Sequence, residues 1–275
     1  MSIRLALVQP ASATGPDEHR NAAAALAWLE RAAGEGADLV VFPEGYPGPA
    51  NPANDYDALT PLAVRAGELG VHVVASRIEP AGDGRYHMSL HLIGDDGSTL
   101  GRYRRTTPCG PYLYGDIPAW EFDYAEADEL PVFETRLGRI GLLVCSEVYV
   151  PELTRVLVLQ GAEIVLCPAG GAINELLDSW RTMVRARAIE SLVYAAACQN
   201  LYEDGEEGVA IIAAPEGVLA ASTHEGLVVA DLDLDRLEYL RQEEEHILFP
   251  KPYATIPGVL RWRRPELYAR LGSGR

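Results

Sequence analysis

"GRIGLLVCSEVYVPELTRVLVLQGAEIVLCP", residues 138–168, is the stretch that decides the fold. Residues 139–144 have the length and largely apolar character of a buried strand, and a second such run closes the stretch. Between the two runs, a break is followed by apolar residues at helical spacing. The stretch therefore predicts a buried strand, a helix and a second buried strand. Cys145 falls where the first strand ends, immediately before Ser146 and Glu147.

The same alternation of elements extends over most of the chain. Hairpin signals are mixed in, as at Asp96-Gly97. Strands that alternate with helices and hairpins predict a mixed α/β layered sandwich rather than an all-parallel dinucleotide-binding sheet, and neither GxGxxG nor GxxxxGK[ST] occurs. Helical patterns cover 18–36, 54–70 and 174–191. Strand-type apolar runs cover 3–10, 37–44, 71–78, 87–94, 138–145, 162–169, 193–200, 208–215 and 226–233.

The composition excludes several classes of protein. The formal net charge of -17 argues against a nucleic-acid partner, because neutralising phosphates needs a basic face. No apolar run reaches the roughly 18–20 residues that span a bilayer, so no membrane partner is expected. The N-terminus enters a strand pattern without a signal peptide, which predicts a cytoplasmic protein.

The four cysteines show neither CxxC nor Cys/His spacing typical of zinc, and no metal is expected. By default, each of Cys109, Cys145, Cys167 and Cys198 is a small buried apolar residue.

Three strand ends nevertheless carry side chains with useful chemistry. Glu44 follows one buried strand, Cys145 ends another, and two arginines lie at the end of "GRYRR". A thiol at the first turn of a helix meets unpaired backbone N–H groups, which lower the thiol pKa. A buried carboxylate could act as a general base, and a guanidinium could stabilise an oxyanion. The residues thus suggest a catalytic Cys145–Glu44 pair, although single buried cysteines are more often structural.

The sequence resembles the nitrilase superfamily, the carbon–nitrogen hydrolases, over nearly its whole length. The motifs that carry the resemblance are "LALVQP" (5–10), "VVFPEGYPG" (40–48), "GRIGLLVCSEVYVPEL" (138–153), "GAEIVLCPA" (161–169), "WRTMVRARAIESLVYAAACQN" (180–200), "DLDLDRLEYLR" (231–241) and "RRPELYARL" (263–271). The resemblance implies a four-layer α-β-β-α sandwich that forms a homodimer or a larger homo-oligomer. We expect one domain over 1–275, with residues from about 245 to 275 as a tail packed on the core or on a partner subunit.

The resemblance also implies roles for individual residues. Glu44 is the general base of the family's FPE motif, and Cys145 is the nucleophile. The backbone N–H of Ser146 is an oxyanion donor. Glu121 is the best match for the family's second glutamate, although a surface role fits it nearly as well. Tyr149, and Tyr112 in the loop 106–126, are expected to line the substrate pocket. No cofactor is implied.

One position departs from the family pattern. The family reads "YRK" where this chain reads Tyr103-Arg104-Arg105, so Arg105 stands at the lysine position. An arginine keeps the positive charge but stays protonated near neutral pH, so it cannot act as an acid. Arg105 could serve as an oxyanion partner, or as a clamp on a substrate carboxylate.

The predicted function is hydrolysis of a non-peptide C–N bond in a small amide or carbamoyl substrate through a cysteine thioester. Hydrolysis of nitriles is less expected, because nitrilases usually place Trp after the cysteine and this chain has Ser146. Acyl transfer to an amine is a variant of the same chemistry. The rival hypothesis is a catalytically impaired binding or scaffold protein, for which Arg105 is the main support.

Overall fold

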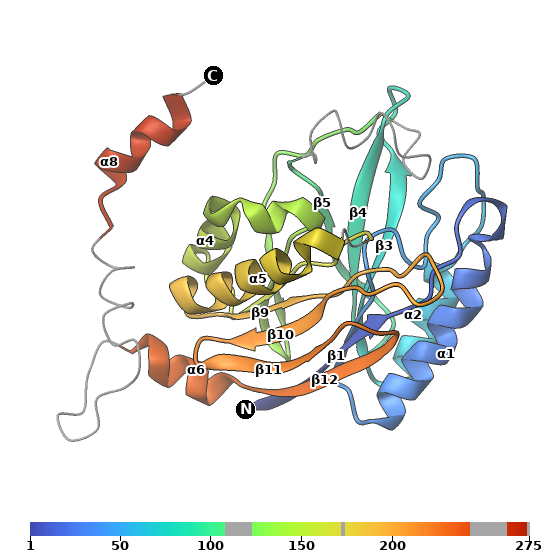
Figure 1. The fold of residues 1–275 in the computed structure, drawn as a ribbon, viewed down its shortest axis with the longest axis horizontal. Coiled ribbons are helices and arrows are strands. Elements are labelled where there is room, and N and C mark those ends of the chain that lie inside the picture. The colour runs from blue at the N-terminus through green and yellow to red at the C-terminus, as the bar shows by residue number, and fades with distance from the viewer. Residues whose placement is uncertain (108–122, 172–173, 243–262, 274–275) are drawn as a thin grey trace.

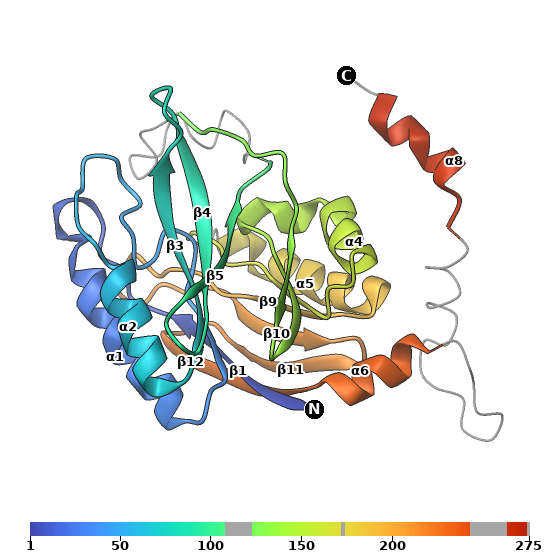
Figure 2. The ribbon, with the colours of Figure 1, turned by 180° about the vertical axis from the view of Figure 1, so that it is seen from behind.

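The computed structural model describes residues 1–107, 123–171, 174–242 and 263–273. Two six-stranded sheets stack face to face, and helices cover both outer faces (Figure 1). Seen from behind, the same four layers are visible (Figure 2). The predicted four-layer α-β-β-α sandwich is therefore confirmed. The covering helices are α1 (Arg20–Gly34) and α2 (Leu59–Leu69) on one side, and α4 (Pro151–Leu159) and α5 (Leu177–Ser191) on the other.

The first sheet has the strand order β12-β1-β2-β3-β4-β5. Its central strands β1, β2 and β3 are parallel, because α1 and α2 carry the chain back between them. The outer pairs are antiparallel, and the β4–β5 hairpin turns at Gly97 as predicted. The strands are β1 (Ser2–Gln9), β2 (Leu39–Val41), β3 (His72–Pro80), β4 (Tyr86–Ile93), β5 (Thr99–Arg104) and β12 (Gly226–Asp233).

The second sheet repeats this plan in the order β11-β10-β9-β8-β7-β6. Strands β7, β8 and β9 are parallel and are connected by α4 and α5. The remaining pairs are antiparallel. The strands are β6 (Val132–Thr135), β7 (Gly138–Leu142), β8 (Ile164–Leu166), β9 (Tyr194–Ala197), β10 (Ala210–Ala214) and β11 (Gly217–Ser222).

Three apolar layers hold the sandwich together, and alternate residues of one strand serve different layers. In β1, Leu5 and Leu7 pack between the two sheets, whereas Ala6 and Val8 pack under α1 and α2. A strand buried on both faces has no polar side, which explains why its sequence reads as a continuous apolar run. The second sheet likewise packs its outer face against α4 and α5.

The opening stretch 138–168 folds as strand, helix and strand, but with different limits. Strand β7 ends at Leu142, and the α-helix begins only at Pro151. A short 3-10 turn, Cys145–Tyr149, lies between them. Strands β6 and β11 were not predicted, because both are edge strands whose residues are largely half-buried or exposed and lack a long apolar run.

The C-terminal part begins with α6 (Leu234–Arg241), which buries Leu237 and Leu240. Further along, residues 263–273 include the short helix α8 (Pro265–Tyr268), where Leu267 and Tyr268 are exposed. Packing of the tail on a second subunit stays a prediction, which the molar mass from light scattering would test. Every helix that the structure describes is too short or too polar to cross a membrane.

Candidate active site

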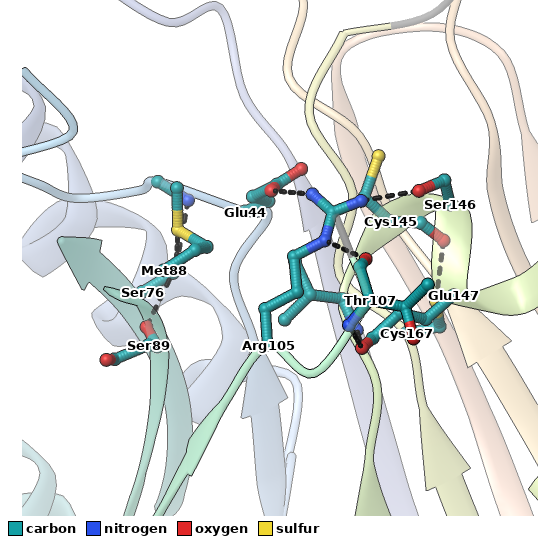
Figure 3. Close-up of polar contacts among 12 residues, drawn as sticks. Glu44, Ser76, Met88, Ser89, Arg105, Thr107, Cys145, Ser146, Glu147 and Cys167 are labelled. Atoms are coloured by element: carbon teal, nitrogen blue, oxygen red, sulfur yellow. Dashed lines mark hydrogen bonds and ion pairs between the residues drawn. The ribbon is translucent and has the colours of Figure 1, made fainter. Parts of the chain in front are cut away.

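Glu44, Arg105 and Cys145, predicted from three separate motifs, lie at the same end of the two sheets (Figure 3). Glu44 follows β2, Arg105 follows β5, and Cys145 follows β7. In Figure 3 the Arg105 guanidinium lies between Glu44 and Ser146, the residue after Cys145. The structure thus brings together a carboxylate, a cation and a thiol from both sheets.

Glu44 is held in place by its backbone and lies almost entirely out of solvent. Its N–H donates to the carbonyl of Ala169 at 3.2 Å, and its own carbonyl accepts from Asn200 Nδ2 at 2.8 Å. Its side chain is 2% exposed, and Oε1 accepts from Arg105 Nη1 at 3.0 Å. A buried carboxylate next to a cation is a suitable setting for a group that takes and returns protons.

Arg105 uses its planar fork to connect both sides of the site. Nη1 donates to Glu44, Nη2 donates to Ser146 Oγ, and Nε donates to the carbonyl of Thr107 at 2.9 Å. The residue is only 3% exposed. An Arg105 turned toward solvent would have favoured the non-catalytic rival, and the structure shows the opposite. A lysine, with a single point-like ammonium, could not make these three divergent contacts at once.

Cys145 lies in a strained turn rather than at the start of an α-helix. Its φ is 52°, a left-handed value that costs a non-glycine residue about 1–3 kcal/mol. Its N–H donates to the carbonyl of Pro168 at 2.8 Å, which holds the turn against β8. Because a single 3-10 turn aligns few peptide dipoles, it offers a thiolate less stabilisation than the expected helix start would.

Ser146 contributes a side chain that the sequence prediction did not use. Its Oγ accepts a hydrogen bond from Arg105. A guanidinium has no acceptor, so the hydroxyl proton of Ser146 must point elsewhere and can be offered to a substrate oxygen. The predicted role of the Ser146 backbone N–H as an oxyanion donor stays a prediction.

The other described cysteines are core residues, as expected. Cys167 Sγ donates to the carbonyl of Cys145 at 3.3 Å, and burial raises its thiol pKa well above the ordinary value. Burial also raises the thiol pKa of Cys198. Both therefore stay protonated, unreactive thiols near neutral pH.

The remaining predicted site residues are less well defined. Tyr149 is 42% exposed, and its ring packs edge-on against Trp180 with a centroid distance of 5.6 Å. Its role in substrate binding stays a prediction. Glu121 and Tyr112 lie outside the described residues, as does Cys109. Among the described residues, no group of three or more His, Cys, Asp or Glu side chains could hold a metal ion.

Sequence reasoning missed two residues near this centre. Glu147, two residues after Cys145, is fully buried. Tyr202 lies against Gly171, where a Cβ would be 2.7 Å from its ring. Burial raises the pKa of the Tyr202 hydroxyl, and the charges of Glu44 and Cys145 raise it further. The residue as a whole is 40% exposed. No sequence signal marks Tyr202.

Comparison with known proteins finds a family and relatives of similar sequence. The family model described as carbon-nitrogen hydrolase matches residues 4–242. The N-carbamoylputrescine amidase of Arabidopsis thaliana is 28% identical, over 93% of this chain and 91% of its own length. The deaminated glutathione amidase of Homo sapiens is 30% identical, over 98% of this chain and 86% of its own length.

Solved structures share the fold. An amidase from Nesterenkonia sp. AN1 superposes with a TM-score of 0.77 at 23% sequence identity, covering 98% of this chain and 96% of that one. That structure, of a glutamate-to-glutamine mutant, shows covalent addition of the acetamide moiety of fluoroacetamide at the active-site cysteine.

The chain belongs to the carbon–nitrogen hydrolase family. Within that family it is an enzyme of the amidase type, a hydrolase of non-peptide C–N bonds.

Proposed function

We propose that this enzyme hydrolyses a small amide or carbamoyl compound, with Cys145 as nucleophile, Glu44 as general base and acid, and Arg105 as the oxyanion partner. The observation that carries the proposal is the position of Arg105. Its guanidinium contacts the buried Glu44 and the residue next to Cys145, so the positive charge lies between the base and the nucleophile. The names of the two amidase relatives, an N-carbamoylputrescine amidase and a deaminated glutathione amidase, support a small amide or carbamoyl substrate.

In the acylation step, the Cys145 thiol gives its proton to Glu44 and the sulfur attacks the substrate carbonyl carbon. The carbonyl oxygen becomes an oxyanion, which Arg105 and the Ser146 hydroxyl stabilise. The C–N bond then breaks, and Glu44 returns the proton to the leaving nitrogen. Arg105 stays protonated throughout, so the proton transfers fall to Glu44 alone.

In the deacylation step, water attacks the thioester. Glu44 takes a proton from the water as the C–O bond forms, and Arg105 again faces the developing oxyanion. The C–S bond breaks, the acid product leaves, and the proton on Glu44 restores the Cys145 thiol. Both halves of the cycle use one base and one cation in the same positions.

The scaffold hypothesis is less well supported than the enzyme. Its support was the change of lysine to arginine, and Arg105 nonetheless places a cation beside Glu44. An arginine that keeps the charge in place keeps the electrostatic part of the lysine's role.

The experiment is turnover of a panel of short aliphatic primary amides and N-carbamoyl amines, followed by release of ammonia. We expect at least one compound of the panel to be hydrolysed, and Cys145→Ser to lose that activity by roughly 10³-fold or more. Cys198→Ser, at a buried cysteine outside the site, is the matched control and should retain turnover. Full activity of Cys145→Ser would overturn the proposal.

A further inference from the structure

Glu147 is the most completely hydrogen-bonded carboxylate that the proposed mechanism does not use. It is 0% exposed. Oε1 accepts from the N–H of Thr106 at 2.9 Å, from Thr106 Oγ1 at 2.8 Å and from the N–H of Thr107 at 3.0 Å. Oε2 accepts from the N–H of Val144 and from the Tyr103 hydroxyl, both at 2.8 Å. Five donors therefore converge on one buried side chain.

These donors come from the two segments that carry the proposed catalytic groups. Oε1 accepts hydrogen bonds from the backbone N–H groups of the two residues that directly follow Arg105. Oε2 accepts one from the N–H of Val144, the residue that directly precedes Cys145. Glu147 thus holds the end of β5 against the nucleophile turn, although the two belong to different sheets.

The contact reaches the guanidinium through Thr107. Glu147 fixes the N–H of Thr107, and the carbonyl of the same residue accepts from Arg105 Nε at 2.9 Å. That bond sets the plane of the guanidinium, which leaves Nη1 for Glu44 and Nη2 for Ser146. A shift of Thr107 would therefore rotate the cation away from both partners.

Tyr103 strengthens this arrangement. Burial raises the pKa of its hydroxyl, and the negative charge of Glu147 raises it further. The phenol therefore stays protonated near neutral pH and can donate to Glu147.

We propose that Glu147 is a positioning residue that fixes the Arg105 guanidinium relative to Cys145. The inference rests on the proposed role of Arg105. Glu147 touches no reacting atom, so its effect on the chemistry passes through Arg105. Its role is to keep the cation where an oxyanion forms.

Glu147→Gln is the informative variant, because an amide keeps the shape and replaces one acceptor oxygen by a donor NH₂. Whichever way the amide lies, at least two of the five donors lose their acceptor. We expect turnover to fall about 30- to 300-fold, mainly in kcat, since misplacing an oxyanion partner acts on the transition state.

A double-mutant cycle distinguishes positioning from general support of the fold. The wild type, Glu147→Gln, Arg105→Ala and the double variant are compared by turnover and by the pH profile of Cys145 alkylation with iodoacetamide. We expect Glu147→Gln to move the alkylation midpoint upward, toward that of Arg105→Ala. When Glu147→Gln is added to Arg105→Ala, turnover should change by less than about a further 2-fold. If the two losses of turnover multiply in the double variant, the inference is overturned. An alkylation midpoint that Glu147→Gln leaves unmoved would overturn it as well.

Two further variants keep the test decisive. Glu79→Gln, at another multiply bonded carboxylate far from Cys145, is the matched control and should leave both readouts within about 2-fold. If Glu147→Gln does not fold, Tyr103→Phe replaces it, since it removes one donor and leaves the carboxylate. Tyr103→Phe should move the alkylation midpoint by less, and this shift must likewise vanish in the Arg105→Ala background.

The outcomes also separate this inference from the function on which it rests. If Arg105→Ala itself leaves turnover and the alkylation midpoint unchanged, the proposed role of Arg105 fails. If Arg105→Ala is impaired and Glu147→Gln is not, only the positioning role of Glu147 fails.

Discussion

The two faces of β5 carry similar residues that serve different purposes. On the outer face, Arg102 and Arg104 contact Glu79 at 3.1 and 3.4 Å. On the inner face, Tyr103 donates to Glu147, and Arg105, just past the strand, contacts Glu44. Successive side chains of a strand point to opposite faces, so "RYRR" divides its residues between a surface cluster and the active site.

The difference lies in what surrounds each carboxylate. The Glu79 side chain is 17% exposed, and its partners include two arginines whose side chains are 43% and 33% exposed. If one partner is lost, water can replace it. Glu147 is fully buried and takes most of its bonds from backbone N–H groups, which would be left unsatisfied. Charge on the outer face therefore adds modest stability, whereas charge on the inner face sets geometry.

The largest difference between the two faces is expected in the effect of arginine substitutions on kcat/KM. Arg105→Ala is expected to lower kcat/KM by about 10²-fold or more, the usual cost of an oxyanion partner. Arg105→Lys should retain or raise activity, because either cation supplies the charge. Arg104→Ala, one residue away on the outer face, should change kcat/KM by less than about 2-fold. Steady-state kinetics on the best substrate of the amide panel measures all three.

A different pattern would favour the substrate-clamp role of Arg105. A guanidinium that forks onto a substrate carboxylate binds ground state and transition state alike. In that case Arg105→Lys would mainly raise KM for acidic amides and spare neutral ones. Equal losses for Arg104→Ala and Arg105→Ala would remove the contrast between the two faces altogether.

The smallest effect is expected at Glu79, and it should depend on pH. Burial opposes the charge of Glu79, but the neighbouring His91, the hydrogen bond from Ser89 and the charge of Arg102 outweigh it and hold the carboxyl pKa well below its usual range. The stabilisation is therefore present above the unfolded-state pKa of about 4.3 and is lost as pH falls below it. Glu79→Gln should lower the free energy of unfolding by about 1 kcal/mol at pH 7.

Denaturant unfolding at a series of pH values measures this effect. The gap between wild type and Glu79→Gln should narrow as pH falls from about 5 toward 3, because only the wild type loses the stabilising charge. If the difference in the free energy of unfolding stays constant over this pH range, the Glu79 charge is not the source of the stabilisation.

The sequence was most informative where burial leaves a strong pattern. Strands such as β1 and β8 are buried on both faces, so their apolar runs predicted two covered sheets. Glu44 and Cys145 each follow such a run, and Arg105 follows the second strand of a predicted hairpin, which made their meeting predictable from strand ends. The edge strands β6 and β11 are covered on fewer sides and left no comparable signal.

Other features depend on contacts between distant segments, which a single sequence does not record. No role was predicted for Glu147, and only its bonds to Thr106 and Thr107 show which segment it holds. The sequence predicted Arg105 as a positive charge. The contact of its guanidinium with Ser146 depends on how closely the two sheets approach each other. The assignments of Glu121 and Tyr112 stay predictions.

The measurement that tests the central claim most directly is acylation of Cys145 in Glu44→Gln by p-nitrophenyl acetate at mildly alkaline pH. This ester's leaving group needs no proton, and a thiol ionises in part without a base at this pH, so acylation can proceed without Glu44, whereas hydrolysis of the thioester needs it. Intact-protein mass spectrometry with peptide mapping should find one acetyl group on Cys145 that persists in Glu44→Gln and turns over in the wild type. An acetyl group on Cys167 or Cys198 instead, or equally fast deacylation in both proteins, would contradict the account.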